Sequence, residues 1–292
     1  MILVTGATGQ FGSKAIDHLL KMGSNSSEIS ALVRDLDKAK SLADKGIDLR
    51  VGDYSDHGSL VNAFRGIDKL LLVSSNDRSG FEKRASQHIN AINAAKQAQV
   101  KHIVYTSFVR KSHFEDSAIA GFQDSHVQTE EALKKSGINY TILQNGIYLE
   151  MIPVFAGNNV AETGNILFPA QTGKASFVLR EELAEAAAHV LLTESHENKV
   201  YQLTNSELVT FYEIANALSI PLGKEVKYSS PSVDEFEGML TKFGVPALYI
   251  GMFIMWGSAL AQGTMDVEDP TLQEILGRKP TSMMQFINKI YG

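Results

Sequence analysis

The sequence of 292 residues contains no cysteine. Disulfide bonds, thiolate metal sites and cysteine nucleophiles are therefore excluded. Positive charge is also in deficit, because 27 lysines and arginines stand against 33 aspartates and glutamates, and no block of basic residues occurs. A chain with a net charge of −6 and no basic patch lacks the electrostatic footprint of a nucleic-acid-binding protein. We expect no nucleic-acid partner.

Motifs of several catalytic classes are missing as well. The eight histidines form no H-E-x-x-H pattern, so no metal site is predicted. No G-x-S-x-G elbow of a hydrolase is present. No basic segment precedes the first predicted strand at Ile2–Val4, and we therefore expect no signal peptide and a cytoplasmic protein.

Long hydrophobic runs are rare, and the most prominent one extends from Val245 to Ala261 without a charged residue. It reaches only the lower end of the range for a membrane span, about 17–25 residues, and no basic cluster flanks it. We predict a buried helix rather than a membrane span. Such a helix packs in the core or covers a substrate pocket or a subunit interface, which leaves a homodimer open.

What the sequence does contain begins with a glycine-rich turn. The apolar run Ile2–Val4 predicts a short buried strand, and Gly6, Gly9 and Gly12 lie between it and a helical pattern that starts at Phe11. Glycines at this crossing allow a tight turn and the close approach of a pyrophosphate, whose charge is stabilised by free N–H groups at the helix start. The G-x-x-G-x-x-G spacing is not the common G-x-G-x-x-G, but the order of strand, loop and helix favours a dinucleotide site over a plain tight turn.

The second predicted strand, Ile29–Val33, is followed by Arg34 and Asp35. In dinucleotide-binding folds an acidic residue at this strand end binds the ribose 2′-hydroxyl of NAD, whereas an arginine accommodates the 2′-phosphate of NADP. The planar guanidinium also suits a phosphate. Arg34 therefore predicts NADPH as the cofactor, and the alternative is an exposed arginine on a solvated loop.

Further apolar segments alternate with helical patterns, which is typical of a parallel sheet in an α/β protein. We predict a Rossmann-type, doubly wound parallel sheet with helices on both faces, plus a smaller, mostly helical C-terminal domain. The NADP-binding domain is expected to comprise residues 1–152, to which 181–204 return, and the substrate-binding domain to comprise 153–180 and 205–292. The remaining strands expected in the sheet are Leu49–Val51, Leu70–Val73, Lys101–Ser107, Tyr140–Leu143 and Val200–Leu203.

Polar residues follow two of these strands at the edge where α/β sheets bind ligands. Ser74, Ser75 and Asn76 follow the fourth strand, and we predict that they face the cofactor. Asp53 follows the third strand. It suits either the adenine amino group or the cap of the helix that starts near Ser59.

A helix predicted over residues 124–136 carries His126 and Glu130 one turn apart. Short-chain dehydrogenases commonly use Tyr-x-x-x-Lys as the acid on this helix, and that pair is absent here. His126, oriented by Glu130, is a candidate proton donor, and a pair on the helix surface is the alternative. Without a strong acid, the pattern favours hydride transfer to an electrophilic acceptor such as a quinone or a cationic dye.

Asn145–Glu150 and Arg180 complete a set of segments that point to one family. The other members of the set are Thr5–Gly12, Val33–Asp35, Gly52–Tyr54, Thr106–Ser107, His126–Glu130 and Leu276–Pro280. Together these segments, spread over nearly the whole chain, resemble the NmrA-like atypical short-chain dehydrogenases. Within that family they are most similar to the branch of bacterial quinone reductases and triphenylmethane reductases.

The resemblance implies that the protein binds NADPH and reduces a small-molecule acceptor. It implies that Asn145 to Glu150 lie near the nicotinamide, and we expect Asn145 and Tyr148 to position the nicotinamide and the acceptor. His126 stays the candidate donor on the basis of its helix spacing. The cofactor contacts that it implies come from Gly6, Ala7, Thr8, Gly9, Gln10, Phe11, Arg34, Ser74, Ser75, Asn76, Asn145, Gly146, Ile147, Tyr148, Leu149, Glu150 and Arg180.

The chain departs from its relatives beside this segment. The quinone-reductase pattern is Arg-Asn-Gly-Trp-Tyr-x-Glu-Asn, whereas this chain has Gln144 at its first position and Met151 at its last. Met151 indicates a more apolar pocket or a different acceptor. We therefore expect an NADPH-dependent reductase of a quinone-like or conjugated acceptor, and the alternative is a catalytically weak NADP(H)-sensing regulator that binds a protein partner.

Overall fold

The computed structural model describes residues 1–75, 80–112 and 114–292, which form two compact units. Unit 1 contains Met1–Phe108, Asp124–Asn145 and Arg180–Gln202, and unit 2 contains Val109–Gln123, Gly146–Leu179 and Leu203–Gly292. Unit 2 thus includes residues 109–123 and 146–152, which the predicted division assigned to the NADP-binding domain. That division by function stays a prediction.

A seven-stranded sheet forms the centre of unit 1, in the order β11-β6-β5-β4-β1-β2-β3. Neighbouring strands from β6 to β3 run parallel, and Leu3 of β1 pairs with Ser30 of β2 and Leu70 of β4. All residues of β2 and β5 are buried, because helices cover both faces of a central parallel strand. The strands are β1 (Ile2–Val4), β2 (Ile29–Val33), β3 (Asp48–Val51), β4 (Lys69–Leu72), β5 (His102–Phe108), β6 (Asn139–Asn145) and β11 (Lys199–Leu203).

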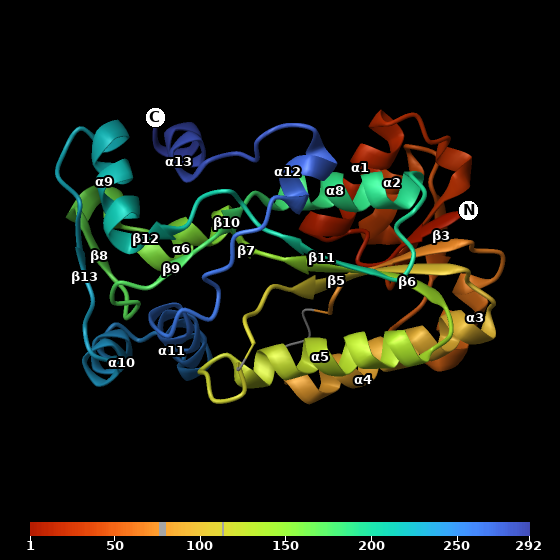
Figure 1. The fold of residues 1–292 in the computed structure, drawn as a ribbon, viewed down its shortest axis with the longest axis horizontal. Coiled ribbons are helices and arrows are strands. Elements are labelled where there is room, and N and C mark those ends of the chain that lie inside the picture. Colours follow the sequence, from red (N-terminus) through yellow and green to blue (C-terminus); the bar gives the residue numbers. More distant parts are fainter. Residues whose placement is uncertain (76–79, 113) are drawn as a thin grey trace. The chain divides into compact units, whose positions relative to one another are not determined.

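Helices lie on both faces of this sheet, with α3, α4 and α5 on one face and α1, α2 and α8 on the other (Figure 1). Helix α1 packs against α8, and α3 packs against α4. This arrangement confirms the predicted doubly wound α/β fold. The helices are α1 (Gln10–Lys21), α2 (Lys40–Ala43), α3 (His57–Phe64), α4 (Phe81–Gln97), α5 (Ala120–Lys135, which enters unit 1 at Asp124) and α8 (Arg180–Leu192), with the 3₁₀ turns η1 (Ser26–Glu28) and η2 (Asp37–Ala39).

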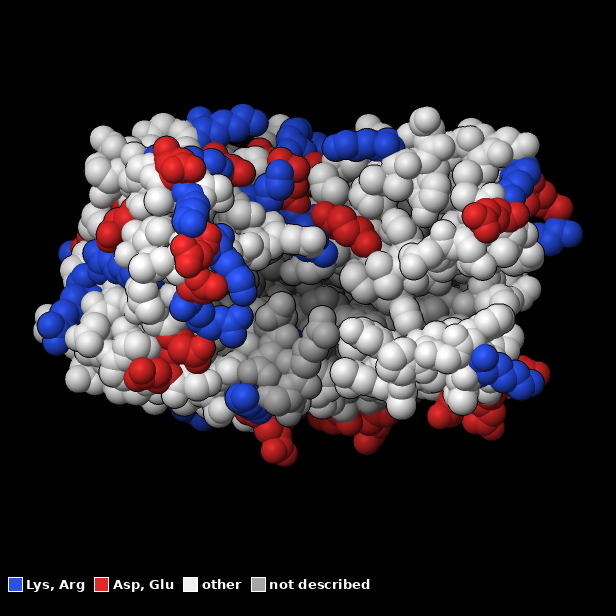
Figure 2. All heavy atoms as spheres, turned by 180° about the vertical axis from the view of Figure 1, so that it is seen from behind, with Lys and Arg blue, Asp and Glu red and all other residues white. Residues whose placement is uncertain are grey.

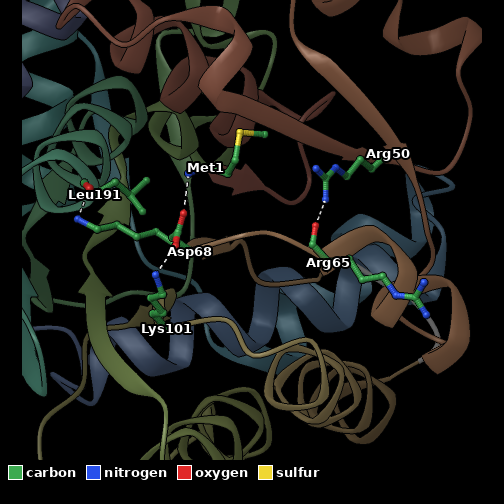
Figure 3. A network of polar contacts seen from close by, with 7 residues as sticks. Met1, Arg50, Arg65, Asp68, Lys101 and Leu191 are labelled. Carbon is green, nitrogen blue, oxygen red and sulfur yellow. Dashed lines mark hydrogen bonds and ion pairs between the residues drawn. The ribbon is translucent and has the colours of Figure 1, made fainter.

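Polar contacts around Asp68 link the amino ends of neighbouring strands of the sheet (Figure 3). The Asp68 carboxylate pairs with the Met1 amino group at 2.9 Å and with Lys101 Nζ at 2.6 Å. Lys69 Nζ donates a hydrogen bond of 2.6 Å to Leu191 O, which joins β4 to α8. The hydrogen bond from Lys101, followed by that from the terminal amine, lowers the pKa of Asp68 from 3.8 to about 2.

Unit 2 consists mostly of helices around an aromatic core, as predicted for the C-terminal part. The Phe168 ring lies 4.7 Å from that of Phe155 and 4.9 Å from that of Phe211, measured between centroids. Capping boxes fix where α9, α10 and α13 begin. The elements are β7 (Ile147–Tyr148), η3 (Leu149–Met151), α6 (Ile152–Ala156), α7 (Val160–Thr163), β8 (Asn165–Leu167), β9 (Lys174–Ala175), β10 (Phe177–Val178), β12 (Val209–Thr210), α9 (Phe211–Leu222), β13 (Lys227–Ser229), α10 (Val233–Lys242), α11 (Ala247–Ala261), α12 (Thr271–Leu276) and α13 (Met283–Tyr291).

The apolar segment 245–261 forms α11, and this helix is less buried than predicted. Ile250 and Leu260 are buried in unit 2, whereas Leu248 is 55% exposed and Met252 is 45% exposed. The expectation of a buried helix is therefore wrong for one face, because a helix that is apolar all round gives no sign of which face is covered. Among the described residues, no helix is long and apolar enough to cross a membrane.

Charged side chains of both signs are interspersed on the face of the chain shown in Figure 2. Exposed ion pairs of the chain include Lys38–Asp35 at 3.7 Å and Lys40–Asp37 at 3.1 Å. Exposed pairs of this kind contribute about 0–1 kcal/mol each. The fold therefore depends on the buried sheet and helix faces rather than on surface charge.

Candidate active site

The glycine loop links β1 to α1, and its backbone is folded tightly. Gly6 has a φ of +57°, and the N–H of Gly9 donates to the carbonyl oxygen of Gly6 at 2.9 Å. A Cβ atom on Gly12 would lie 2.4 Å from that same oxygen. Gly6 is required for a left-handed backbone and Gly12 for the close approach of α1 to the loop.

The start of α1 is prepared for an anion. Within the described chain, Gly9 precedes the helix without a side-chain cap, and the first turn contains no acidic residue. The first N–H groups of a helix lack partners inside it, and its dipole favours negative charge there. Arg180, the first residue of α8, donates a hydrogen bond from Nη1 to Gln10 Oε1 and so brings a positive charge to this helix start. This arrangement fits a pyrophosphate.

Arg34 follows β2 as an exposed residue. In the part of the chain that the structure describes, its guanidinium pairs with no carboxylate. The neighbouring Asp35 is engaged in its own turn, because its Oδ1 accepts from the N–H of Asp37 at 3.0 Å and its Oδ2 lies 3.7 Å from Lys38 Nζ. An unpaired guanidinium beside an occupied carboxylate suits a phosphate better than a pair of ribose hydroxyls.

Ser74 and Ser75 follow β4 after Val73, at the carboxyl end of the sheet. The N–H of Ser74 donates to Thr106 Oγ1 at 2.8 Å. The N–H of Ser75 donates to His88 Nε2 at 2.8 Å, and its hydroxyl donates to Gln87 Oε1 at 2.7 Å. Side chains of β5 and α4 therefore hold the backbone of two predicted cofactor residues.

Sequence reasoning did not single out Gln87 or His88. A signal for His88 was present, because it falls at helical spacing on the same face of α4 as Ala85, Ile92 and Ala95, which are buried. A polar residue on a buried helix face requires a hydrogen-bond partner. Its partner, the amide of Ser75, could not be identified from spacing.

His126 is 2% exposed, so the expected alternative of a pair on the helix surface is wrong. Its Nδ1 lies 2.8 Å from the hydroxyl of Tyr105, and its Nε2 lies 3.5 Å from Arg84 Nη1. Burial raises the pKa of the Tyr105 hydroxyl above its ordinary range, so this group stays protonated. The role of His126 as proton donor stays a prediction.

Glu130 is also 2% exposed and lies beneath the ends of β5 and β6. The hydroxyl of Ser107 donates to its Oε1 at 2.5 Å, and Gln144 Nε2 donates to the same oxygen at 3.2 Å. Gln144 occupies the position of the Arg in the quinone-reductase pattern, so a neutral amide here contacts a buried carboxylate. In the described ranges, no group of three or more potential ligands could hold a metal ion.

Asn145 ends β6, opposite Phe108 of β5. It is 2% exposed, and neither its Oδ1 nor its Nδ2 has a hydrogen-bond partner among the described residues. A buried polar group without a partner costs about 1–3 kcal/mol. The amide lies at the carboxyl end of the parallel sheet, where α/β proteins bind ligands. Its free donor and acceptor fit a polar ligand such as the carboxamide of a nicotinamide.

The remaining predicted residues lie elsewhere. Asn76 is outside the described residues. Gly146 and the four residues after it belong to unit 2, where the N–H of Gly146 donates to Leu203 O at 2.9 Å and Ile147–Tyr148 pairs with Phe177–Val178. The side chains of Ile147 and Leu149 are buried in unit 2, whereas Tyr148, Glu150 and Met151 are partly exposed. Their proposed contacts with the cofactor stay predictions.

This glycine loop, followed by an arginine after β2 and polar residues after β4 to β6, is the ligand-binding edge of a dinucleotide-binding α/β protein. The chain belongs to the NmrA-like family, whose sequence model matches residues 1–286. It is 36% identical over 292 residues to quinone oxidoreductase 2 of Escherichia coli, and the match covers 100% of this chain and 99% of that protein.

Solved structures show the same likeness. The triphenylmethane reductase of Citrobacter sp. in complex with NADP(H) is 37% identical with a TM-score of 0.91, covering 99% of both chains. The NADPH complex of the Escherichia coli quinone oxidoreductase is 36% identical with a TM-score of 0.90, covering 100% of both chains.

A further relative is similar in sequence. An NAD(P)H azoreductase of Xenophilus azovorans is 28% identical over 98% of this chain and 96% of that protein. The family resemblance predicted from the sequence is confirmed.

Proposed function

We propose that the protein is an NADPH-dependent reductase that transfers a hydride to a quinone-like or otherwise conjugated small molecule. The observation that carries the proposal is the buried, unpartnered amide of Asn145 on the same sheet edge as the glycine loop. The similar proteins named above support it, because they are reductases of quinones, triphenylmethane dyes and azo compounds by name. These acceptors share a conjugated, electron-poor system.

The residues of unit 1 fit the parts of NADPH in order. The backbone from Gly6 to Phe11 and the start of α1 would hold the pyrophosphate, with Arg180 beside them. Arg34 would hold the 2′-phosphate. Ser74 and Ser75 would line the path toward the nicotinamide, and Asn145 would bind its carboxamide. When bound, NADPH supplies the hydride.

The chain's own contribution to the chemistry would be to orient the acceptor against the nicotinamide, because a conjugated acceptor needs little help from an acid. Reduction of a quinone adds one hydride and one proton, and the first negative charge is spread over a conjugated ring. A weak or distant donor therefore suffices. His126 is the candidate donor on α5, and Tyr148 in unit 2 is the candidate for positioning the acceptor. Met151, where relatives have Asn, predicts a preference for apolar acceptors.

The test is NADPH oxidation measured against a panel of benzoquinones, naphthoquinones, azo dyes and triphenylmethane dyes. We expect turnover with at least one class and faster turnover with more apolar members. Cofactor binding without turnover of any acceptor would refute the reductase proposal. In that case a partner protein whose affinity changes with NADPH would support the sensing alternative. Met151→Asn is the informative variant, because it should shift the preference toward polar acceptors.

A cytoplasmic location remains a prediction, and a homodimer remains an open alternative. The first is tested by fractionating cells that produce the protein. The second is tested by sedimentation at several concentrations. A monomer at all concentrations would contradict the homodimer.

A further inference from the structure

The segment that follows β4 is held in an unusual way. The consecutive backbone N–H groups of residues 73, 74 and 75 each donate a hydrogen bond to a side chain. The acceptors are Thr5 Oγ1, Thr106 Oγ1 and His88 Nε2, and each donor–acceptor distance is 2.8 Å. These three side chains come from the end of β1, from β5 and from α4. The path of the chain at the ligand-binding edge is therefore set by side chains rather than by a neighbouring strand.

His88 is the most specialised of these acceptors. The amide of Ser75 is a donor, so Nε2 of His88 must be unprotonated. The proton of the neutral ring then lies on Nδ1, which faces Thr129 Oγ1 at 3.0 Å and the hydroxyl of Tyr105 at 3.3 Å. The Thr129 hydroxyl donates to Ser125 O at 2.8 Å, so its oxygen is able to accept the Nδ1 proton. One tautomer alone satisfies all of these contacts.

The environment of His88 keeps that tautomer neutral. The side chain is fully buried, with the rings of Tyr105 and Tyr54 at 5.4 Å and 6.2 Å between centroids. Burial, followed by the positive charge of Arg84, lowers the pKa of His88 to about 3. Protonation of Nε2 would replace the acceptor of the Ser75 amide by a donor. A neutral His88 therefore preserves the bond to Ser75 over the whole physiological pH range.

We propose that His88, together with Gln87, is a positioning residue for the nicotinamide cofactor. It sets the conformation of residues 73–75, and so the affinity for NADPH, through the amide of Ser75. Gln87 reinforces it by accepting from the Ser75 hydroxyl. This inference rests on the proposed function, since Ser74 and Ser75 are cofactor residues only in that proposal.

The test compares three variants by NADPH fluorescence titration, with KM and kcat measured where turnover occurs. His88→Leu removes the acceptor and should raise the Kd for NADPH about tenfold, which is the loss of one hydrogen bond to the binding segment. His88→Gln places an acceptor oxygen near the position of Nε2 and should restore the Kd to within about threefold of wild type. In both variants KM should change more than kcat, because the effect is on binding.

His102→Leu is the matched control. His102 is also a buried histidine of unit 1 with one hydrogen bond, from Nε2 to Thr141 Oγ1 at 2.8 Å, but it lies at the amino end of β5. This variant should lose stability as His88→Leu does and keep the wild-type Kd. An equal rise in Kd for both leucine variants, or none for His88→Leu, would overturn the inference.

Three further outcomes are separable. If His88→Leu does not fold, Gln87→Leu replaces it, and an unchanged Kd in that variant would overturn the inference. If the wild-type protein itself binds no NADPH, the proposed function fails and the inference fails with it. If the wild type binds and only the variants behave unexpectedly, the proposed function stands and the role of His88 does not.

Discussion

Acid should destabilise this protein at pH values where most carboxylates are still ionised, and two buried histidines are the reason. Burial lowers the pKa of His88 from 6.5 to about 3 and that of His102 from 6.5 to about 4. In His102 the Nε2–H donates to Thr141, whose own hydroxyl donates to His196 O at 2.7 Å, so Nδ1 would take the proton. Among the described residues, that Nδ1 has no partner.

The sign and the size of the effect follow from linkage. Above pH 6.5 both histidines are neutral in the folded and unfolded chains, so stability does not depend on their titration. Below pH 6.5 the unfolded chain binds protons that the folded chain refuses, and the free energy of unfolding falls. One such histidine contributes about 1.4 kcal/mol per pH unit, hence about 2 kcal/mol for each histidine, or about 4 kcal/mol for the two, between neutral pH and about pH 5. This is a large part of a typical stability of about 5–15 kcal/mol.

The assay is urea unfolding followed by circular dichroism at pH values from about 5 to 8, in wild type and in His102→Leu. Between about pH 8 and about pH 5, the free energy of unfolding of the variant should fall by roughly half of the amount that we assign to His88 and His102 together, whatever its stability at neutral pH. His57→Gln is the control of opposite sign, because the ring nitrogens of the exposed His57 donate hydrogen bonds to Gln97 Oε1 and Asn90 Oδ1, which raise its pKa. Replacing His57 should therefore make the free energy of unfolding fall more steeply as the pH is lowered. Equal slopes in wild type and His102→Leu would refute the reasoning.

Three further predictions concern single side chains. Arg34→Ala should weaken NADPH binding by about 1.5–3 kcal/mol and change NADH binding little, which titration of both cofactors will decide; equal losses would show that Arg34 does not contact the 2′-phosphate. Asn145→Leu should raise the stability of the cofactor-free protein by about 1–3 kcal/mol and abolish NADPH binding, so a destabilised variant that still binds would contradict the role given to this amide. Asp68→Asn should lower the free energy of unfolding by less than about 1 kcal/mol at neutral pH, because the ion pairs of Asp68 are exposed. The lowered pKa of Asp68 predicts that the difference in stability between this variant and wild type disappears as the pH falls from 3.8 toward about 2. Thermal unfolding at several pH values measures this difference, and a constant difference would contradict the prediction.

The parts of the fold that follow from local patterns could be predicted from the sequence. The strands Ile2–Val4 and Ile29–Val33 coincide with β1 and β2, because a short, mostly apolar run that alternates with helical patterns is typical of a central parallel strand. The strand at Tyr140–Leu143 extends to Asn145 in the structure. Its last residues, Gln144 and Asn145, are polar and buried, so hydrophobicity alone ends the strand too early.

The polar interior of unit 1 lay beyond such reasoning. His88 of α4 contacts Ser75, which follows β4. Glu130 of α5 contacts Ser107 of β5 and Gln144 of β6, so these contacts join elements that are distant in the sequence. Spacing along one helix placed Glu130 beside His126 but gave no sign that both are buried. The exposed face of α11 could not be predicted for the same reason, because burial of an all-apolar helix depends on what packs against it.

The turn after β2 bears on how cofactor preference changes during evolution. In the proposed role of Arg34, its replacement would remove the contact with the 2′-phosphate of NADPH. It would offer NADH nothing, since the carboxylate of Asp35 remains bound to the Asp37 amide and faces Lys38. A switch to NADH therefore requires a second change that rebuilds this turn and releases a carboxylate for the ribose. We expect the intermediate sequence with only the first change to bind both cofactors weakly, so a change of cofactor preference at this loop needs both substitutions.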